Sequence, residues 1–129
     1  MHFPVSVKGV LLEGDCVVLL ENERQEWELP GGRLERGEDP ITCLAREFSE
    51  ELGTHILVEE ILDCWLYEVL PRREVVIVTY GVRRLDRRAF QVSREHRRVG
   101  IFAVNELQTV PMPEGYRRSI GAWAARRSV

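Results

Sequence analysis

The segment from Asp39 to Gly53 constrains the fold more than any other, because it carries the marks of a complete helix. Asp39 followed by Pro40 is typical of an N-cap and a first helical residue, and Gly53 is a typical C-terminal stop. Between them, apolar residues recur at the spacing of one helix face: Ile41, Leu44, Ala45, Phe48 and Leu52. We therefore expect a helix whose apolar stripe packs against a sheet or a partner helix.

A second face of this helix carries three glutamates, Glu47, Glu50 and Glu51, at spacings i, i+3 and i+4. Side chains at these spacings share a face, so the three carboxylates are expected to converge. Such like charges destabilise a helix by roughly a few tenths of a kcal/mol per pair, and a bound divalent cation reverses that effect. Oxygen ligands favour Mg²⁺, with Mn²⁺ as the alternative. Taken alone, the E-x-x-E-E pattern favours the competing interpretation, a solvated acidic face.

The remaining segments predict strands around this helix. Residues 5–12 and 16–20 are rich in β-branched residues and are joined by a turn, which predicts a hairpin. Further strands are expected at residues 56–70, 74–82 and 98–104, and a terminal helix at residues 116–127. Pro30, Gly31 and Gly32 are expected to interrupt any regular element and to allow close backbone approach.

Length and composition favour one globular domain over residues 1–129. The longest apolar run, residues 16–20, is far too short to cross a bilayer. The first residues lack the features of an export signal, so a cytoplasmic location is the default expectation. Cys16, Cys43 and Cys64 lie far apart in sequence and are expected to be buried or partly buried thiols.

Arginine dominates the basic residues, since only Lys8 among 18 lysines and arginines is a lysine. A guanidinium group binds phosphate with two parallel hydrogen bonds, which would suit a phosphorylated ligand. For any single arginine pair, however, a solvated surface is the simpler interpretation. The net charge of -3 argues against broad nucleic-acid binding.

The spacing of residues 32–54 matches a longer pattern. Gly32 is followed after five residues by Glu38 and after seven more by the run Arg46-Glu47-Phe48-Ser49-Glu50-Glu51-Leu52-Gly53. This stretch resembles the signature of the Nudix hydrolase family. The departure is Thr54, where the family usually has an aliphatic residue. Trp27-x-Leu29-Pro30-Gly31 and Glu95-His96 also look like family features, although they are less specific.

The resemblance implies roles for the glutamates. Glu50 and Glu51 would ligate Mg²⁺ with help from the Gly31 carbonyl oxygen. Glu47 would bind a second ion or take the proton from the attacking water. Arg46 and Glu38 would support these glutamates through ion pairs.

The resemblance leaves the roles of several other residues open. Glu95 would be a metal ligand, a catalytic base or a solvated loop residue, and His96 beside it is expected to be a bystander. Trp27 is expected either to stack on a nucleobase or to cap the core. Arg33, directly after the two glycines, is expected to bind substrate.

The resemblance further implies a Nudix-type α/β/α sandwich with a mixed β-sheet, with which the order of expected elements is compatible. The implied activity is hydrolysis of a phosphoric anhydride in a nucleoside diphosphate derivative: a nucleoside triphosphate, ADP-ribose or a nucleotide sugar. Pro71 lies one residue from the offset that we associate with ADP-ribose hydrolases, so the leaving group stays unassigned. The alternatives are a silent nucleotide-sensing or partner-binding domain and an RNA 5′-end pyrophosphohydrolase. The expected partner is a small nucleotide, and a homodimer is an open alternative.

Overall fold

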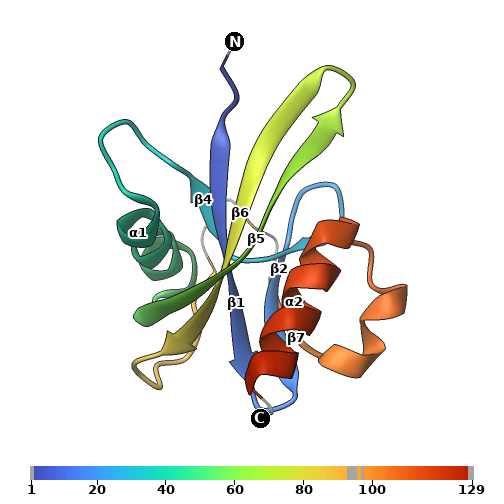
Figure 1. The fold of residues 1–129 in the computed structure, drawn as a ribbon. Helices are drawn as coiled ribbons and strands as arrows, with labels where there is room; N and C mark the ends of the chain where they lie inside the picture. Colours follow the sequence, from blue (N-terminus) through green and yellow to red (C-terminus); the bar gives the residue numbers. More distant parts are fainter. Residues whose placement is uncertain (1, 93–95, 97, 128–129) are drawn as a thin grey trace.

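The computed structural model describes residues 2–92, 96 and 98–127 (Figure 1). Its elements follow one another as β1 (Val5–Glu13), β2 (Cys16–Glu21), β3 (Trp27–Glu28), β4 (Gly31–Arg33), α1 (Pro40–Leu52), β5 (Ile56–Leu70), β6 (Arg73–Arg84), β7 (Arg98–Ala103), the 3-10 helix η1 (Val104–Thr109) and α2 (Glu114–Arg127). The strands form one sheet of seven with the order β3-β2-β1-β6-β5, in which β4 also pairs with β1 and β7 with β2.

The two helices lie on opposite sides of the sheet, with α1 on the left and α2 on the right in Figure 1. Each covers its own apolar cluster. Val7 and Leu11 of β1 pack with Phe48 of α1, whereas Val10 of the same strand packs with the α2 residues Ile120 and Trp123. Alternation along a strand sends successive side chains to opposite faces, so β1 contributes to both cores. The expected α/β/α sandwich is confirmed.

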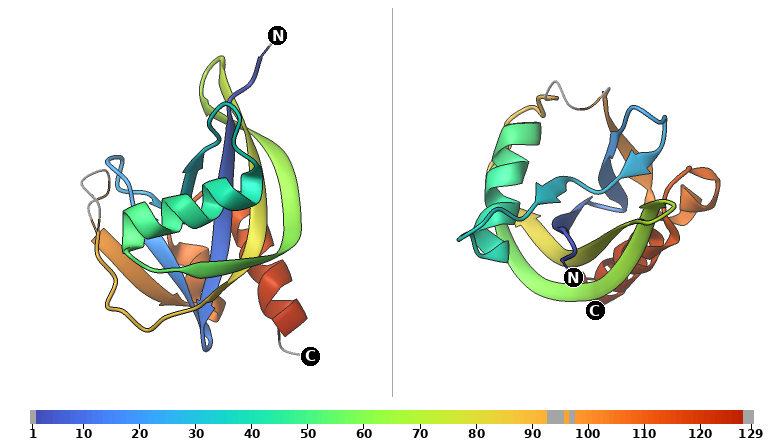
Figure 2. Two further views of the ribbon diagram at one scale, coloured as in Figure 1. Left: turned by 90° about the vertical axis from the view of Figure 1, so that its left-hand side faces the viewer. Right: turned by 90° about the horizontal axis from the view of Figure 1, so that it is seen from above.

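The sheet is mixed because β1 pairs parallel with β6 and antiparallel with β2 and β4. The long strand β5 pairs antiparallel with β6 and curves strongly around the molecule, as Figure 2 shows. The expected hairpin and the three expected later strands are all present. The expected interruption is present at Pro30, which lies between the short strands β3 and β4, but Gly31 and Gly32 belong to β4.

Helix α1 has the ends that the sequence predicts. The Asp39 side chain accepts a hydrogen bond from the Thr42 backbone N–H at 2.9 Å, and Gly53 ends the helix in the left-handed region at φ 67°. One member of the expected apolar stripe is wrong. Ile41 is 53% exposed, because it lies in the first turn, before the residues that pack on the sheet. Cys43 is buried instead, with its Sγ 3.6 Å from the Arg33 carbonyl oxygen of β4.

The cysteines follow the expectation at two positions of three. Cys43 is buried and Cys16 is partly buried, but Cys64 is exposed. Cys64 lies in β5 between two partly buried neighbours, Asp63 and Trp65, and alternation turns its side chain to the outer face. No helix in the described part of the chain is long and apolar enough to span a membrane.

Candidate active site

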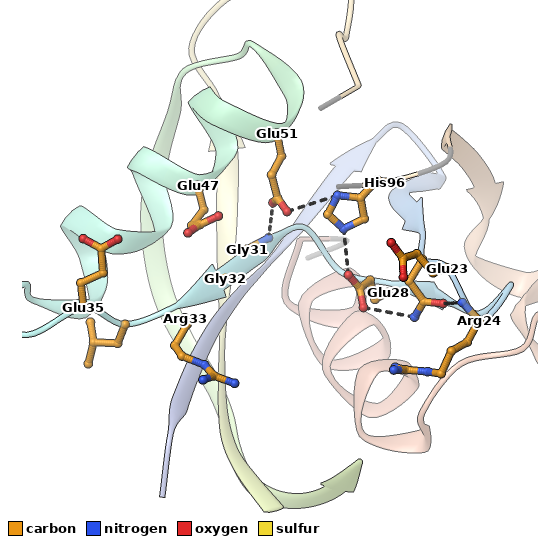
Figure 3. A pocket seen from close by; sticks show the side chains of 12 residues that line it. Glu23, Arg24, Glu28, Gly31, Gly32, Arg33, Glu35, Glu47, Glu51 and His96 are labelled. Atoms are coloured by element: carbon orange, nitrogen blue, oxygen red, sulfur yellow. Dashed lines mark hydrogen bonds and ion pairs between the residues drawn. The ribbon is translucent and has the colours of Figure 1, made fainter. Parts of the chain in front are cut away.

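A cavity of about 610 Å³ opens between α1, β4 and the loop that leads into β3 (Figure 3). This volume is in the range of sites for molecules of nucleotide size. Its walls are mostly charged and polar. The lining residues are Asn22, Glu23, Arg24, Glu28, Gly31, Gly32, Arg33, Leu34, Glu35, Glu47, Glu51 and His96.

Glu51 is the most deeply buried acidic residue of the cavity wall, at 4% exposure. One of its carboxylate oxygens accepts a hydrogen bond from the Gly31 backbone N–H at 2.8 Å. The other lies 3.5 Å from His96 Nδ1. Burial disfavours the charged form and raises the pKa of Glu51 to about 7, although Lys8 and the Gly31 N–H oppose this rise. Glu51 is thus a carboxylate short of compensating positive charge.

Glu47 lies one turn earlier on α1 and faces the Gly31–Gly32 backbone (Figure 3). A Cβ atom on Gly32 would come within 2.4 Å of the Glu47 carboxyl carbon, so only glycine allows this approach. Gly31 has φ 139°, and a Cβ there would lie 2.0 Å from the Val7 carbonyl oxygen. The close approach expected at these glycines is present. Burial also raises the pKa of Glu47.

Arg46 joins the glutamates on the outer side of α1. Its guanidinium group donates to both carboxylate oxygens of Glu38, at 2.7 and 3.0 Å, and to Glu47 Oε1 at 3.0 Å. The hydrogen bonds from Arg46 lower the pKa of Glu38 to about 2. Arg46 therefore makes ion pairs with both Glu38 and Glu47, the contacts on which its expected supporting role depends.

The three glutamates do not all line the cavity. Glu50 is 59% exposed in its side chain and lies outside the lining, and its carboxylate pairs with Arg46 Nη1 at 3.3 Å. The same Nη1 atom lies 3.0 Å from Glu47 Oε1, so the carboxylates of Glu47 and Glu50 are neighbours, and the expected part of Glu50 in metal binding stays a prediction. In the described part of the chain, no three His, Cys, Asp or Glu side chains form a metal-binding group.

A buried charged network lies beneath the cavity, and no local sequence pattern predicts it. Lys8 of β1 is 8% exposed, and its Nζ lies 3.4 Å from the Gly31 carbonyl oxygen and 3.9 Å from Glu28 Oε1. Burial disfavours the Lys8 charge, but the facing Tyr116 and Glu28 outweigh it and raise its pKa. Burial alone would likewise raise the pKa of Glu28, yet Lys8 and His96 lower it to about 2.

His96 belongs to this network, and its expected place as a bystander to the chemistry stays a prediction. Its Nε2 lies 2.9 Å from Glu28 Oε1, while its Nδ1 faces Glu51. Burial opposes protonation, but the neighbouring carboxylates Glu28 and Glu51 raise the pKa of His96. His96 thus connects two carboxylates that are 23 residues apart in sequence. The alternating pattern of a β-strand does not predict such a contact.

The three remaining candidate residues lie in different surroundings. Trp27 is 8% exposed and packs edge-on against Phe102, with ring centroids 4.7 Å apart, which is the core-capping alternative. Arg33 lines the cavity and is exposed. Glu95 lies outside the described residues.

The charges of the cavity suit a divalent cation. Five glutamates and two arginines line it, so three negative charges are in excess when His96 is neutral. Burial raises the pKa of Glu47 and of Glu51, and a bound cation would favour their charged forms. Carboxylate oxygens are the ligands that Mg²⁺ and Mn²⁺ prefer. Glu47 and Glu51 are the residues that fit this role, and the Gly31 carbonyl oxygen already accepts from Lys8.

Solved structures share the fold over nearly the whole chain. A MutT protein from Methanosarcina mazei Go1 superposes with a TM-score of 0.81, covering 98% of this chain and 96% of that one, at 22% identity. Curated relatives are closer in sequence. A MutT-like protein of Streptomyces ambofaciens is 42% identical over 76 residues, which are 57% of this chain and 48% of the relative. An RNA pyrophosphohydrolase of Rhizobium meliloti is 31% identical over 101 residues, 77% of this chain and 57% of the relative.

The chain thus has the α/β/α sandwich fold of the Methanosarcina mazei Go1 protein. The sequence model of the NUDIX domain matches residues 2–123, and the chain belongs to that family. It spans about half the length of the two curated relatives.

Proposed function

We propose that this chain is a Mg²⁺-dependent pyrophosphohydrolase that cleaves the phosphoric anhydride of a nucleoside diphosphate derivative. The observation that carries the proposal is the pair Glu47 and Glu51, whose carboxylates face the Gly31–Gly32 backbone inside a cavity of nucleotide size. Family membership supports this class of reaction, because the Rhizobium meliloti relative is named a pyrophosphohydrolase. Mn²⁺ is the alternative ion.

The residues of the site would divide the work as follows. Glu51 and Glu47 would hold the cation, which when bound neutralises phosphate oxygens and acidifies water. Arg46 donates a hydrogen bond to Oε1 of Glu47, and Oε2 has no hydrogen-bond partner among the described residues. Oε2 of Glu47 would therefore hold a cation or, alternatively, act as the base. In the second case the water oxygen forms a bond to phosphorus, the anhydride P–O bond breaks, and the water proton passes to Glu47 Oε2.

One feature of the surroundings would add to this chemistry. Lys8 and His96 lie beside Glu28 and Glu51 and keep the floor of the cavity fixed. Fixed polar groups lower the reorganisation that accompanies a change of charge in the reaction.

A second candidate is pyrophosphate removal from the 5′ end of RNA. The Rhizobium meliloti relative, which covers 77% of this chain, bears that name. The reacting bond would be the same, and only the group attached to the 5′-triphosphate would differ. A cytoplasmic location, a single domain and a homodimer remain predictions.

The test is a substrate panel with Mg²⁺: nucleoside triphosphates, ADP-ribose, a nucleotide sugar and a 5′-triphosphorylated RNA. Release of phosphate, pyrophosphate or nucleoside monophosphate is measured for the wild type and Glu51→Gln. We expect cleavage of at least one member, loss of about 10²-fold in kcat for the variant, and no cleavage in EDTA. Absence of cleavage across the panel would favour a nucleotide-sensing or partner-binding domain instead.

A further inference from the structure

The buried contacts beneath the cavity form a closed ring that begins and ends at Gly31. The Gly31 N–H donates to Glu51 Oε1 at 2.8 Å, and Glu51 Oε2 lies 3.5 Å from His96 Nδ1. His96 Nε2 lies 2.9 Å from Glu28 Oε1, and Figure 3 shows the ring up to this point. The same Glu28 oxygen lies 3.9 Å from Lys8 Nζ, which donates to the Gly31 carbonyl oxygen at 3.4 Å. Both polar backbone groups of Gly31 are therefore held by one network.

Lys8 is the cationic member of this ring and the only lysine in the chain. Its side chain is buried, and burial opposes its charge, but Tyr116 and Glu28 together raise its pKa, so the ammonium group stays charged at neutral pH. A buried ammonium group is costly unless nearby carboxylates compensate it. Besides Glu28, both Glu51 and Glu47 lie close enough to interact with this charge. Lys8 is thus an internal counter-ion of the acidic cavity.

An internal counter-ion and a bound metal ion compete for the same negative charge. Glu47 and Glu51 are the proposed metal ligands, and Lys8 already offsets part of their charge. The Gly31 carbonyl oxygen, a further expected ligand, accepts from Lys8 and would be shared between the ammonium group and the metal ion. Like charges that are close together and poorly solvated repel one another strongly. The lysine is therefore expected to oppose metal binding.

We propose that Lys8 is a positioning residue that holds the Gly31 carbonyl oxygen and, as an internal counter-ion, lowers the affinity of the cavity for a divalent cation. This inference rests on the proposed function and adds to it a residue that controls the metal site. The alternative is that Lys8 only neutralises Glu28, its ion-pair partner at 3.9 Å. That alternative predicts unchanged or weaker metal binding when the lysine is replaced.

The first test measures Mn²⁺ binding to the substrate-free protein by electron paramagnetic resonance. The variant is Lys8→Met, because methionine keeps an unbranched side chain and removes the charge. We expect Lys8→Met to bind Mn²⁺ at least about tenfold more tightly than the wild type. Glu28→Gln removes a negative charge from the same ring and is expected to weaken Mn²⁺ binding by about threefold or more. Damage to the fold would weaken binding in both variants, so it cannot produce opposite signs.

Arg118→Gln is the matched control for the loss of a positive charge elsewhere. Arg118 is 54% exposed in its side chain and belongs to α2, on the opposite side of the sheet from α1 (Figure 1). Its interaction with a cation in the cavity is screened by solvent, so Mn²⁺ affinity is expected to change by less than about twofold.

The second test uses the wild type alone and does not depend on the folding of a variant. Because Lys8 is the only lysine, ¹³C labelling of lysine gives a single Cε–Hε signal in nuclear magnetic resonance spectra. Mg²⁺, which is diamagnetic, is expected to shift this signal over the concentration range in which it displaces bound Mn²⁺. A signal that does not move while Mg²⁺ displaces Mn²⁺ would overturn the proposal.

Four outcomes of the Mn²⁺ titrations would also overturn it. They are unchanged or weaker binding by folded Lys8→Met, tighter binding by Glu28→Gln, an equal gain in Arg118→Gln, and no binding by either the wild type or Lys8→Met. Should Lys8→Met fail to fold, the Lys8 signal of the wild type decides.

Hydrolysis of the substrate panel separates this inference from the proposed function. If Lys8→Met binds Mn²⁺ more tightly and the wild type cleaves no panel substrate, the proposed activity fails and the role of Lys8 stands. If the wild type cleaves a substrate with Mg²⁺ and Lys8→Met binds Mn²⁺ no more tightly, the role of Lys8 fails and the activity stands.

Discussion

Replacing Glu51 by glutamine is expected to stabilise the metal-free protein above neutral pH. Burial raises the pKa of Glu51 from 4.5 to about 7. One pH unit corresponds to about 1.4 kcal/mol, so ionising Glu51 costs the folded state about 3 kcal/mol relative to the unfolded chain. Glutamine resembles the protonated carboxyl group and keeps an oxygen for the Gly31 N–H.

The sign of the pH dependence follows from the raised pKa. Between about pH 4.5 and pH 7 the folded protein binds more protons than the unfolded chain, so the Glu51 contribution destabilises progressively as pH rises. Below pH 4.5 this penalty is absent. The free energy of unfolding of Glu51→Gln should therefore equal that of the wild type near pH 4 and exceed it by about 3 kcal/mol at pH 8.

Urea unfolding in EDTA at several pH values measures this difference. Glu50→Gln is the matched control, since its side chain is 59% exposed and its substitution should change stability by no more than about 0.5 kcal/mol. Adding Mg²⁺ should reduce the advantage of Glu51→Gln, because a bound cation stabilises only the wild-type carboxylate. A difference that does not depend on pH, or a variant less stable than the wild type at pH 8, would refute the reasoning.

Three further substitutions test other parts of the account. Glu47→Gln should lower kcat by roughly 10²-fold without changing the far-UV circular dichroism spectrum, and near-normal kcat would contradict its assigned role. In Gly32→Ala the new Cβ would lie 2.4 Å from the Glu47 carboxyl carbon, so the carboxyl group should be displaced and kcat should fall by about tenfold or more. Unchanged kinetics would show that the close approach is not needed. In Gly81→Ala the new Cβ would lie 2.3 Å from the Trp123 ring of α2. The free energy of unfolding in urea should fall by about 1–3 kcal/mol, and KM should stay unchanged. A wild-type unfolding midpoint would show that the Trp123 ring moves aside at little cost.

Local patterns were sufficient for the main elements of the fold. The Asp39 cap and the Gly53 stop defined α1 because both act within a few residues of the helix ends. Ile41 was assigned to the core because periodicity shows which face of a helix is apolar. It does not show at which residue along the helix the contact with the sheet begins. Exposure at a helix end depends on tertiary packing.

The acidic side chains of the cavity were predicted only where they are neighbours on one helix. Glu47 and Glu51 were identified by their spacing, and both line the cavity. Glu50 lies outside the cavity lining, where it pairs with Arg46 beside Glu47, a detail that helical spacing does not specify. The contacts of His96 with Glu28 and of Lys8 with Gly31 join residues 68 and 23 positions apart, and no local pattern specifies such pairs.

The central claim, that Glu47 and Glu51 hold a divalent cation, is tested most directly by Mn²⁺ titration of the substrate-free protein with electron paramagnetic resonance. The account predicts that the wild type removes Mn²⁺ from solution, and that Glu51→Gln weakens this binding by at least about tenfold. Equal Mn²⁺ binding by the wild type and Glu51→Gln, or none by the wild type with or without nucleotide, would contradict it.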